Sequence, residues 1–320
     1  MRALRFDRYG SSDVLKIEEV IEPVPRPGQA KLRVDAVSLN PIDWKVRAGD
    51  LRLIPLFRGP PRGLGCDFAG EVVAIGGGAT ERHVGERVFG SLLPFARDGA
   101  LAESLVVAYE RILPIPEGVD DAVAAALPIA GGAALQGLID EAGVVAGQRV
   151  LVNGAAGGVG HFAVQIAKHL GTQVVGVCSA ANVEFVRGLG ADEVIDYARD
   201  DFTKRSDRFD VVFDAAGASS FEAAKRVLTE FGCYLNTSGT LAAVATTAVS
   251  AVIARLTSRQ RAIPLALRSG PPMWHRLREL VRSGAMRPHI ERTIALDEVP
   301  SALRGMETGH GRGKIVVRLR

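Results

Sequence analysis

The sequence predicts an α/β protein with two parts, a compact β-rich domain and a domain built on a doubly wound parallel sheet. Short runs rich in Val, Ile and Leu dominate the first 120 residues, with Gly, Pro and Asp turns between them. Strands and helices then alternate, which is typical of a parallel sheet covered on both faces. A glycine-rich loop joins the first of these later strands to the helix that follows it.

Length and composition agree with a globular protein of two domains. The chain has 320 residues, of which 47% are hydrophobic and 23% are charged. The formal net charge is only +3 and long runs of like charge do not occur, which argues against nucleic acid or a membrane surface as a partner. The three cysteines are widely spaced, and the N-terminus lacks the apolar run of a signal peptide. We therefore expect a protein of the reducing cytoplasm.

The β-rich part is expected to form a barrel or a sandwich. Its turns are explicit in PVPRPGQ, IGGGAT and VGERV, because glycine and proline supply the backbone angles that tight turns need. The strands are expected in LKIEEV, QAKLRVDAVSL, GEVVAIG, ERVFGS and SLVVA.

Helical spacing begins near residue 120, in DDAVAAALPIAGGAALQGLIDEAG. Buried strands are then expected in RVLVN, TQVVGVCS, DEVID, FDVVFDAAG and CYLNTSG, with helices in HFAVQIAKHLG, NVEFVRGLG and SFEAAKRVLTEFG. Residues 241–260 are apolar and compatible with a helix, and RAIPLALR reads as an edge strand because of its proline. A helix in PPMWHRLRELVRSG and a final strand–helix–strand segment complete the chain.

The segment VLVNGAAGGVG carries the candidate nucleotide-binding loop. Ala155, Gly157 and Gly160 follow the G-x-G-x-x-G spacing of the dinucleotide fingerprint between a strand and a helix, with alanine at the first position. Gly157 would let the backbone approach a pyrophosphate, and Gly160 would let the helix pack on the strand. The alternative is a glycine turn that only packs. The cofactor contacts predicted in this loop are Asn153, Ala155, Gly157, Gly158, Val159 and Gly160.

The end of the second strand of this domain bears on the choice of cofactor. An NAD enzyme places an acidic residue there, which accepts hydrogen bonds from the ribose 2′-hydroxyl. The sequence VCSAANVEF instead offers Ser179 and Asn182, which can donate to a 2′-phosphate without repelling it. The segment therefore favours NADPH over NADH.

Several motifs together resemble the zinc-independent branch of the medium-chain dehydrogenase/reductase superfamily, in its quinone oxidoreductase and alkenal/enoyl reductase group. They are SLNPIDWKVRAG, LGCDFAGEVVAIG, VGERVFG, VLVNGAAGGVG, LGADEVIDY, VVFDAAG and GRGKIVVRL. The resemblance implies a GroES-like β-barrel domain formed by residues 1–121 and 271–320. It implies a Rossmann dinucleotide-binding domain over residues 122–270, and a homodimer formed through an edge strand, for which RAIPLAL is the candidate.

The resemblance also implies site residues. Tyr197, Ala216, Ser238 and Lys314 match cofactor positions of the family. Asn40, Asp43 and Lys45, in NPIDWK, match positions near the nicotinamide and the substrate, and an Asp43–Lys45 salt bridge is the structural alternative for Lys45.

The stretch LGCDFAG occupies the place of a metal-binding segment in zinc-dependent relatives. Zinc there needs three protein ligands, and this chain offers Asn40, Cys66 and Asp67 without a nearby histidine. We therefore expect no catalytic metal. Cys66 as a nucleophile would need a base partner, and none is evident in the sequence.

Three functional hypotheses follow. The first is an NADPH-dependent reductase of quinones or α,β-unsaturated carbonyl compounds, which are electron-poor enough to accept hydride without a metal. The second is an enoyl-thioester reductase, with Arg255, Arg259 and Arg261 as candidate contacts of a phosphopantetheine arm. The third is a non-catalytic NADPH-binding regulatory protein, in which residues 241–260 present a surface to a partner.

Overall fold

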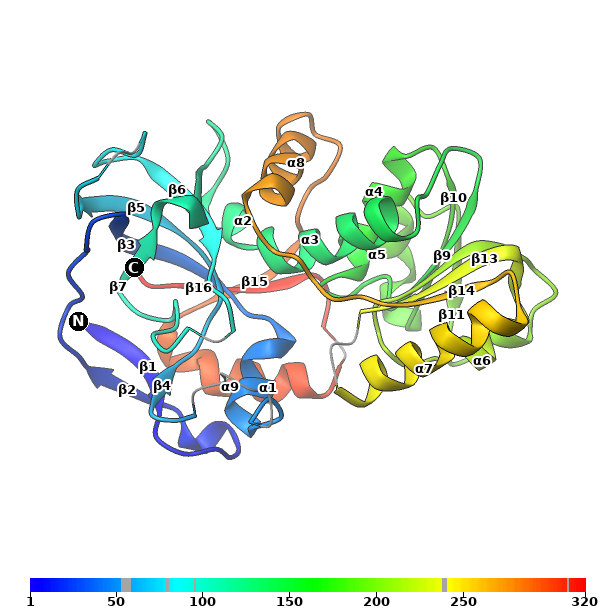
Figure 1. The fold of residues 1–320 in the computed structure, drawn as a ribbon, viewed down its shortest axis with the longest axis horizontal. Coiled ribbons are helices and arrows are strands. Elements are labelled where there is room, and N and C mark those ends of the chain that lie inside the picture. Colours follow the sequence, from blue (N-terminus) through cyan, green and yellow to red (C-terminus); the bar gives the residue numbers. More distant parts are fainter. Residues whose placement is uncertain (53–58, 79–80, 95, 238–240, 310) are drawn as a thin grey trace. The chain divides into compact units, whose positions relative to one another are not determined.

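The computed structural model describes residues 1–52, 59–78, 81–94, 96–237, 241–309 and 311–320. The chain divides into two compact units, shown as ribbons in Figure 1. Unit 1 comprises residues 1–129, 269–282 and 289–320, and unit 2 comprises residues 130–268 and 283–288.

Unit 1 is built on two largely antiparallel sheets. A three-stranded sheet has the order β2-β1-β4, and a seven-stranded sheet has the order β15-β16-β3-β5-β6-β8, with β7 paired to β3. The strands are β1 (Arg2–Phe6), β2 (Lys16–Glu19), β3 (Gln29–Ser38), β4 (Arg62–Gly63), β5 (Asp67–Ile75), β6 (Arg87–Ser91), β7 (Ser104–Ala108), β8 (Ile112–Pro114), β15 (Ile290–Ile294) and β16 (Lys314–Arg318). The helices are α1 (Pro41–Ala48), α2 (Asp121–Ala125), α8 (Pro271–Arg282) and α9 (Val299–Glu307).

The C-terminal strand completes the larger sheet of unit 1. Residue Val317 on β16 lies opposite Val37 on β3, and these two strands run antiparallel. Alternate residues of β3 are buried, so Leu32 and Val34 enter the apolar core while the residues between them are half-exposed. This pairing brings the start of β16 beside the end of β3, where the buried polar residues of unit 1 gather.

Unit 2 is a six-stranded parallel sheet with the order β11-β10-β9-β12-β13-β14. Helices α4 and α5 cover one face and α6 and α7 the other (Figure 1), which is the doubly wound arrangement. The strands are β9 (Arg149–Asn153), β10 (Gln173–Cys178), β11 (Glu193–Asp196), β12 (Phe209–Asp214), β13 (Leu228–Asn236) and β14 (Arg261–Pro264). The helices are α3 (Pro128–Leu135), a π-helical segment (Gln136–Glu141), α4 (Gly160–His169), α5 (Val183–Gly188), α6 (Phe221–Ala224) and α7 (Leu241–Thr257). The predicted α/β class and the edge position of RAIP in β14 are confirmed.

Three local predictions need correction. The helix expected in SFEAAKRVLTEFG is only the short α6, because the chain enters β13 at Leu228, which pairs with Phe209 of β12. The helical run after residue 120 divides into α2 and α3, since Pro128 has no N–H to continue the first helix. Helix α1 was not predicted in the β-rich part. It begins at Pro41, and proline is well suited to a first helical position.

The unit boundaries differ from those predicted from the sequence at three places, of which residues 269–270, now in unit 1, are the smallest. Residues 122–129 belong to unit 1, because α2 packs against β3 and β5. Residues 283–288 belong to unit 2, where the N–H of Arg287 donates to Gln165 Oε1 over 2.8 Å.

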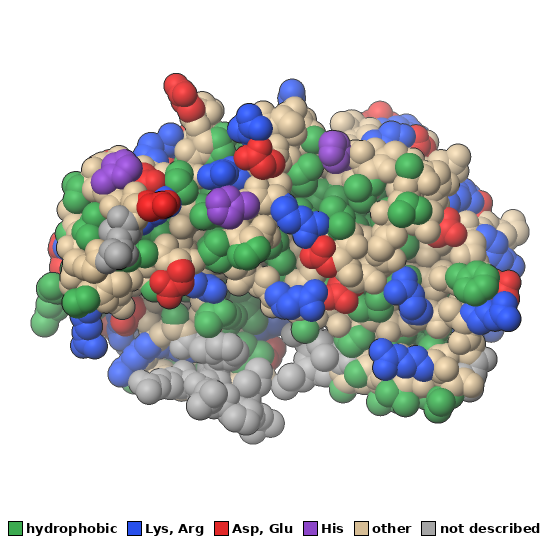
Figure 2. Space-filling model, turned by 45° about the horizontal axis from the view of Figure 1, so that its top comes forward, with side chains coloured by type: hydrophobic (Ala, Val, Ile, Leu, Met, Phe, Trp, Pro, Cys, Tyr) green, Lys and Arg blue, Asp and Glu red, His purple; other side chains and the backbone are tan. Residues whose placement is uncertain are grey.

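Charged side chains of both signs are mixed on the surface. On the face that Figure 2 shows, Lys and Arg side chains lie among Asp, Glu and uncharged ones, in agreement with the small net charge. Among the described residues, no helix has the length and apolar character that crossing a membrane requires.

Candidate active site

The carboxyl ends of neighbouring strands bring the predicted cofactor residues to one edge of the unit 2 sheet. β9 ends at Asn153, which lies opposite Val177 of β10 and Asp214 of β12. Asp214 lies opposite Asn236 at the end of β13. Ligands of open parallel sheets bind beyond the carboxyl ends of the strands, where the strand order reverses. In this sheet the order reverses between β9 and β12.

The glycine loop between β9 and α4 has the close packing that the fingerprint requires. A Cβ atom at Gly160 would lie 2.0 Å from the carbonyl oxygen of Gly154, so only glycine fits. Gly154 has φ of 78° and makes the tight turn, which explains why Ala155 is accepted at the first fingerprint position. Among the described residues, no side-chain hydrogen bond caps the N-terminus of α4. The His161 N–H donates to the Gly157 carbonyl over 3.1 Å, and the partial positive charge of this helix end is suited to phosphate oxygens.

The remaining loop residues, Gly157, Gly158 and Val159, are half-buried. A Cβ atom at Gly157 would lie 3.4 Å from the Gly154 carbonyl oxygen, an ordinary contact. Glycine at 157 is therefore not demanded by the packing of the protein itself.

Ser179, Asn182 and Tyr197 lie near one another beyond β10 and β11. Asn182 Nδ2 donates to Ser179 Oγ over 3.2 Å, and both residues are half-buried. The N–H of Tyr197 donates to the carbonyl of Cys178 over 3.1 Å, which ties the end of β11 to the end of β10. The Tyr197 ring is 53% exposed. A hydroxyl, an amide and an exposed ring so placed suit a nucleotide phosphate and ribose.

Charged residues close to this place form local pairs. Asp196 accepts a hydrogen bond from the Ala198 N–H over 3.1 Å and lies 3.6 Å from the Arg199 guanidinium. Arg187 is exposed and lies 2.6 Å from the Glu184 carboxylate. Asp196 ends β11, the strand next to β10, and these contacts partly neutralise its carboxylate charge.

Asp214 organises the loop after β12, and the sequence analysis did not single it out. Its Oδ1 accepts hydrogen bonds of 2.9 Å from Asn153 Nδ2 and from the Gly217 N–H. Its Oδ2 accepts hydrogen bonds of 2.9 Å from the Tyr234 hydroxyl and from the Ser219 N–H. The carboxylate is fully buried and satisfied by these four donors. An acidic residue at the end of an apolar strand, followed by Ala-Ala-Gly, was the available sequence signal.

Two further predicted cofactor residues follow these strands. Ala216 is exposed, and its N–H donates to the carbonyl oxygen of Asn153 over 3.2 Å. Ser238 lies outside the described residues.

Unit 1 contains a buried polar cluster centred on Asn40. Asn40 Nδ2 donates to Asp67 Oδ2 over 3.0 Å and to the carbonyl oxygen of Ser38 over 3.2 Å. Lys314 Nζ donates to Asn40 Oδ1 over 2.7 Å and to the carbonyl oxygen of Leu39 over 2.8 Å. The exposed fractions are 1% for Asn40, 0% for Asp67 and 2% for Lys314. Lys314, predicted as a cofactor residue, thus contacts the catalytic candidate Asn40.

Asp43 joins this cluster to the LGCDFAG segment. Its Oδ2 accepts a 2.7 Å hydrogen bond from the Asn40 N–H, and its Oδ1 accepts a 3.2 Å hydrogen bond from the Gly65 N–H. Burial raises the pKa of Asp43 to about 7, against the opposing effect of the Asn40 hydrogen bond. Burial likewise raises the pKa of Asp67 to about 6, although the Lys314 charge lowers it. Both carboxyl groups can therefore change protonation near neutral pH.

Lys45 lies against Trp44. Its Nζ is 5.6 Å from the centre of the Trp44 ring, and the Lys45 side chain is buried. Burial lowers the pKa of Lys45, and the Asp50 charge opposes this shift. Trp44 packs against the apolar core of unit 1. The hydrogen bonds described for the Asp43 carboxylate come from the backbone N–H groups of Asn40 and Gly65, and the Asp43–Lys45 salt bridge stays a prediction.

The three cysteines should resist alkylation in the folded protein. Burial raises the pKa of Cys66 well above its usual value and the pKa of Cys178 and Cys233 to about 11. Because the thiolate is the reactive species, iodoacetamide should label them at least about 100-fold more slowly than it labels the urea-unfolded protein. Mass spectrometry of timed samples would measure both rates. Rapid labelling of native Cys66 would instead restore the nucleophile hypothesis.

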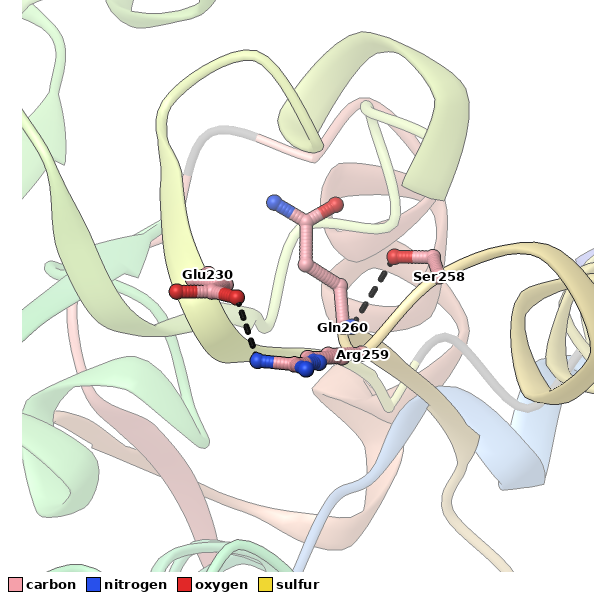
Figure 3. Close-up of a pocket in the computed structure, with 4 residues that line it drawn as sticks. All are labelled: Glu230, Ser258, Arg259 and Gln260. Atoms are coloured by element: carbon pink, nitrogen blue, oxygen red, sulfur yellow. Dashed lines mark hydrogen bonds and ion pairs between the residues drawn. The ribbon is translucent and has the colours of Figure 1, made fainter.

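An open hollow of about 530 Å³ in unit 2 lies apart from these residues. It is lined by Glu230, Ser258, Arg259 and Gln260 (Figure 3). Arg259 donates to Glu230 over 2.7 Å, and the Gln260 N–H donates to Ser258 Oγ over 2.9 Å. Arg261 donates to the carbonyl of Ala142 over 2.9 Å. Arg259 and Arg261 are thus engaged in structural contacts, which weakens the case for an acyl-thioester site that uses them.

Comparison with known proteins identifies the family. Residues 26–117 match the alcohol dehydrogenase GroES-like domain, and residues 189–317 match the zinc-binding dehydrogenase family. The chloroplast envelope quinone oxidoreductase homolog of Arabidopsis thaliana is 34% identical, with 99% of this chain and 98% of the relative covered. The chain belongs to the quinone oxidoreductase group of the medium-chain dehydrogenase/reductase superfamily.

Two other members of this superfamily also align with nearly the whole chain. The quinone oxidoreductase of Coxiella burnetii has a solved structure that is 34% identical, with a TM-score of 0.89 and coverage of 100% of this chain and 99% of that one. The NADPH-dependent alkenal/one oxidoreductase of Arabidopsis thaliana is 32% identical and aligns with 99% of this chain and 79% of its own length. The chain is therefore an oxidoreductase of this superfamily.

In this chain, the positions that bind zinc in zinc-dependent dehydrogenases of the superfamily carry residues that do not fit zinc. Cys66 is the only cysteine or histidine among the three residues at these positions, whereas zinc takes at least three Cys, His or carboxylate ligands. The Asn40 amide and one oxygen of Asp67 are engaged with each other, and the Lys314 ammonium group lies beside them. Among the described residues, no group of three or more His, Cys, Asp or Glu side chains could hold a metal ion.

Proposed function

We propose that the protein is an NADPH-dependent reductase that transfers hydride to a quinone or an α,β-unsaturated carbonyl compound without a catalytic zinc ion. One observation carries the proposal: at the place of a zinc site, the Asn40 amide is hydrogen-bonded to the Lys314 ammonium group and to Asp67. Substrates that need no metal to accept hydride are those already electron-poor at the ring or at the β-carbon. The relatives named above, a quinone oxidoreductase homolog and an alkenal/one oxidoreductase, support the same class.

The residues of unit 2 fit a dinucleotide. The tightly packed loop from Gly154 to Gly160 and the start of α4, which has no side-chain cap among the described residues, would hold the pyrophosphate. Ser179 and Asn182 would donate to the 2′-phosphate, with Tyr197 beside them. Asp214 fixes the loop that contains Ala216, and this loop would contact the nicotinamide end of the cofactor. Ser238 is a further proposed contact of the nicotinamide end. When bound, NADPH supplies the hydride.

The residues of unit 1 would act on the substrate side. Asn40 is held in one orientation and would position the nicotinamide or the substrate. Asp43 and Lys45, whose pKa values burial shifts toward neutrality, are the candidates to hold or deliver the proton that completes reduction of an enone.

We expect NADPH consumption with an ortho-quinone, an enone or an enal, and a much slower rate with NADH. Loss of NADPH absorbance would be followed against a panel that also contains a crotonyl thioester and an aldehyde. Fastest turnover of the thioester would favour an enoyl-thioester reductase. Aldehyde turnover that a chelator abolishes would mean that a metal acts, and tight NADPH binding without any turnover would favour a regulatory protein.

The choice of NADPH is tested by placing an acid at the end of β10. Ser179→Asp should lower kcat/KM for NADPH about 100-fold and spare NADH, because a carboxylate repels the 2′-phosphate and accepts from a 2′-hydroxyl. Ser206→Asp, at an exposed serine of the same unit, is the matched control. An unchanged NADPH/NADH ratio in Ser179→Asp would remove Ser179 from the cofactor site.

We also propose a homodimer that forms through the edge strand β14, and the cytoplasm as its compartment. β14 pairs with β13 on one side and ends the sheet on the other, so its free edge can pair with a second copy. Light scattering coupled to gel filtration would give the mass in solution, which should be twice that of the chain.

A further inference from the structure

The amide of Asn40 is fully specified by its neighbours. The Lys314 ammonium group can only donate, so the atom that faces it is the amide oxygen Oδ1. Asp67 accepts from Nδ2 over 3.0 Å, and the Ser38 carbonyl accepts the other Nδ2 hydrogen over 3.2 Å. Both N–H groups of Asn40 are therefore in use, and only a lone pair on Oδ1 remains for a ligand.

Asn40 stands at the N-cap position of α1, and its backbone is fixed there by Asp43. The Asn40 N–H donates to Asp43 Oδ2 over 2.7 Å, and the Asn40 carbonyl accepts from the Asp43 N–H over 2.9 Å. The side-chain oxygen Oδ1 lies 2.7 Å from Lys314 Nζ, which is 274 residues away in the sequence. Backbone and side chain of Asn40 are thus both held in place.

We propose that Lys314 is a positioning residue that, together with Asp67, locks the Asn40 amide so that Asn40 acts through its oxygen as a hydrogen-bond acceptor. The partner of that oxygen would be a hydroxyl or amide N–H group of the cofactor or substrate. Asn40 is then not the donor to a developing oxyanion. This inference rests on the proposed function only for the identity of that partner.

The charges around Lys314 are consistent with this role. Burial lowers the pKa of Lys314 to about 8, while the charges of Asp67 on β5 and Asp43 on α1 raise it. Arg62 and Cys66 are the other titratable groups that lie near these two carboxylates. Removing the ammonium group leaves buried carboxylates without their counter-charge.

The test compares Lys314→Met with the wild-type protein. Lys314→Met should lower kcat about 10- to 100-fold, because the amide is no longer held, while the Kd for NADPH stays within about twofold. We expect the wild-type kcat to fall above about pH 8, where Lys314 loses its proton, and we expect this fall to be absent in the variant. Lys16→Met, at an exposed lysine of the same unit, controls for loss of a charge.

A spectroscopic measurement keeps the inference independent of turnover. The chain has four asparagines, Asn40, Asn153, Asn182 and Asn236, so ¹⁵N-asparagine labelling gives four side-chain amide signals. Asn40→Ala assigns one of them. In Lys314→Met the Asn40 signal should shift and exchange with solvent faster, while the other three stay in place.

The outcomes separate the inference from the proposed function. If the wild-type protein turns over none of the substrates, the proposed function fails, but the Asn40 signal still tests the lock. Weaker NADPH binding in Lys314→Met with unchanged kcat and an unchanged Asn40 signal would overturn the inference and make Lys314 a cofactor ligand. Should Lys314→Met not fold, the wild-type protein replaces it: the Asn40 signal should shift as Lys314 loses its proton near pH 8, while the other three stay in place, and an unmoved Asn40 signal would overturn the lock.

Discussion

Gly160→Ala should lose about 2–3 kcal/mol of unfolding free energy and about 100-fold in NADPH affinity. The added methyl carbon would lie 2.0 Å from the Gly154 carbonyl oxygen and 2.9 Å from the Ala155 Cα, both backbone atoms that no rotamer change can move. The start of α4 must then shift away from β9, and the N–H groups of its first turn no longer point at the pyrophosphate. Urea unfolding and a fluorescence titration with NADPH would measure the two effects.

Gly157→Ala is the control for this prediction. The added Cβ would meet the Gly154 carbonyl oxygen at 3.4 Å, and Gly157 has no positive φ, so the fold should keep its stability within about 0.5 kcal/mol. NADPH affinity should still fall, because the methyl group would stand where the pyrophosphate approaches the backbone. Normal NADPH binding by both variants would mean that the loop is only a packed turn.

Asp214→Ala should destabilise unit 2 by about 3–5 kcal/mol and weaken NADPH binding. The substitution removes the acceptor of three donors, the N–H groups of Gly217 and Ser219 and the Asn153 amide, while the Tyr234 hydroxyl keeps the Ser219 carbonyl as an acceptor. The loop that holds Ala216 then loses its fixed shape. Thermal unfolding followed by circular dichroism, together with an NADPH titration, would show both effects.

Tyr234→Phe is the matched control for Asp214→Ala. It removes the hydroxyl, which also contacts the Ser219 carbonyl and Asn236 Nδ2, but it leaves the carboxylate with three donors, so the loss should be about 1–2 kcal/mol. If Asp214→Ala were as mild as Tyr234→Phe, the loop after β12 would not depend on this carboxylate.

Part of the candidate site could be predicted from local sequence. The glycine loop, the acid-free end of β10 and the strand–helix alternation are each encoded within short stretches, because a turn, a strand end and a periodic apolar face depend on neighbouring residues. The parallel sheet then brings Asn153, Asp214 and Asn236 together, since parallel strands share their carboxyl edge. Motif resemblance gave the family, which the comparisons confirm.

The start of β13 shows where local reading fails. RVLTEF is compatible with a helix or a strand, and pairing of Leu228 with Phe209 on β12 decides for the strand. Asp214 was overlooked for a similar reason. Its importance lies in four donors that come from two strands and a loop, and no short stretch shows them together.

The sequence alone therefore determined the fold class, the nucleotide loop and the family of this protein, because each depends on patterns carried by contiguous residues. The tertiary structure decided the state of the catalytic candidates. Asn40, Asp67 and Lys314 lie on three separate segments, and only the pairing of β16 with β3, and of β3 with β5, places them within hydrogen-bond distance in a buried site. Burial there shifts the pKa values of Asp67 and Lys314, and the surrounding hydrogen bonds fix the Asn40 amide. Burial is a property of the folded chain rather than of any motif.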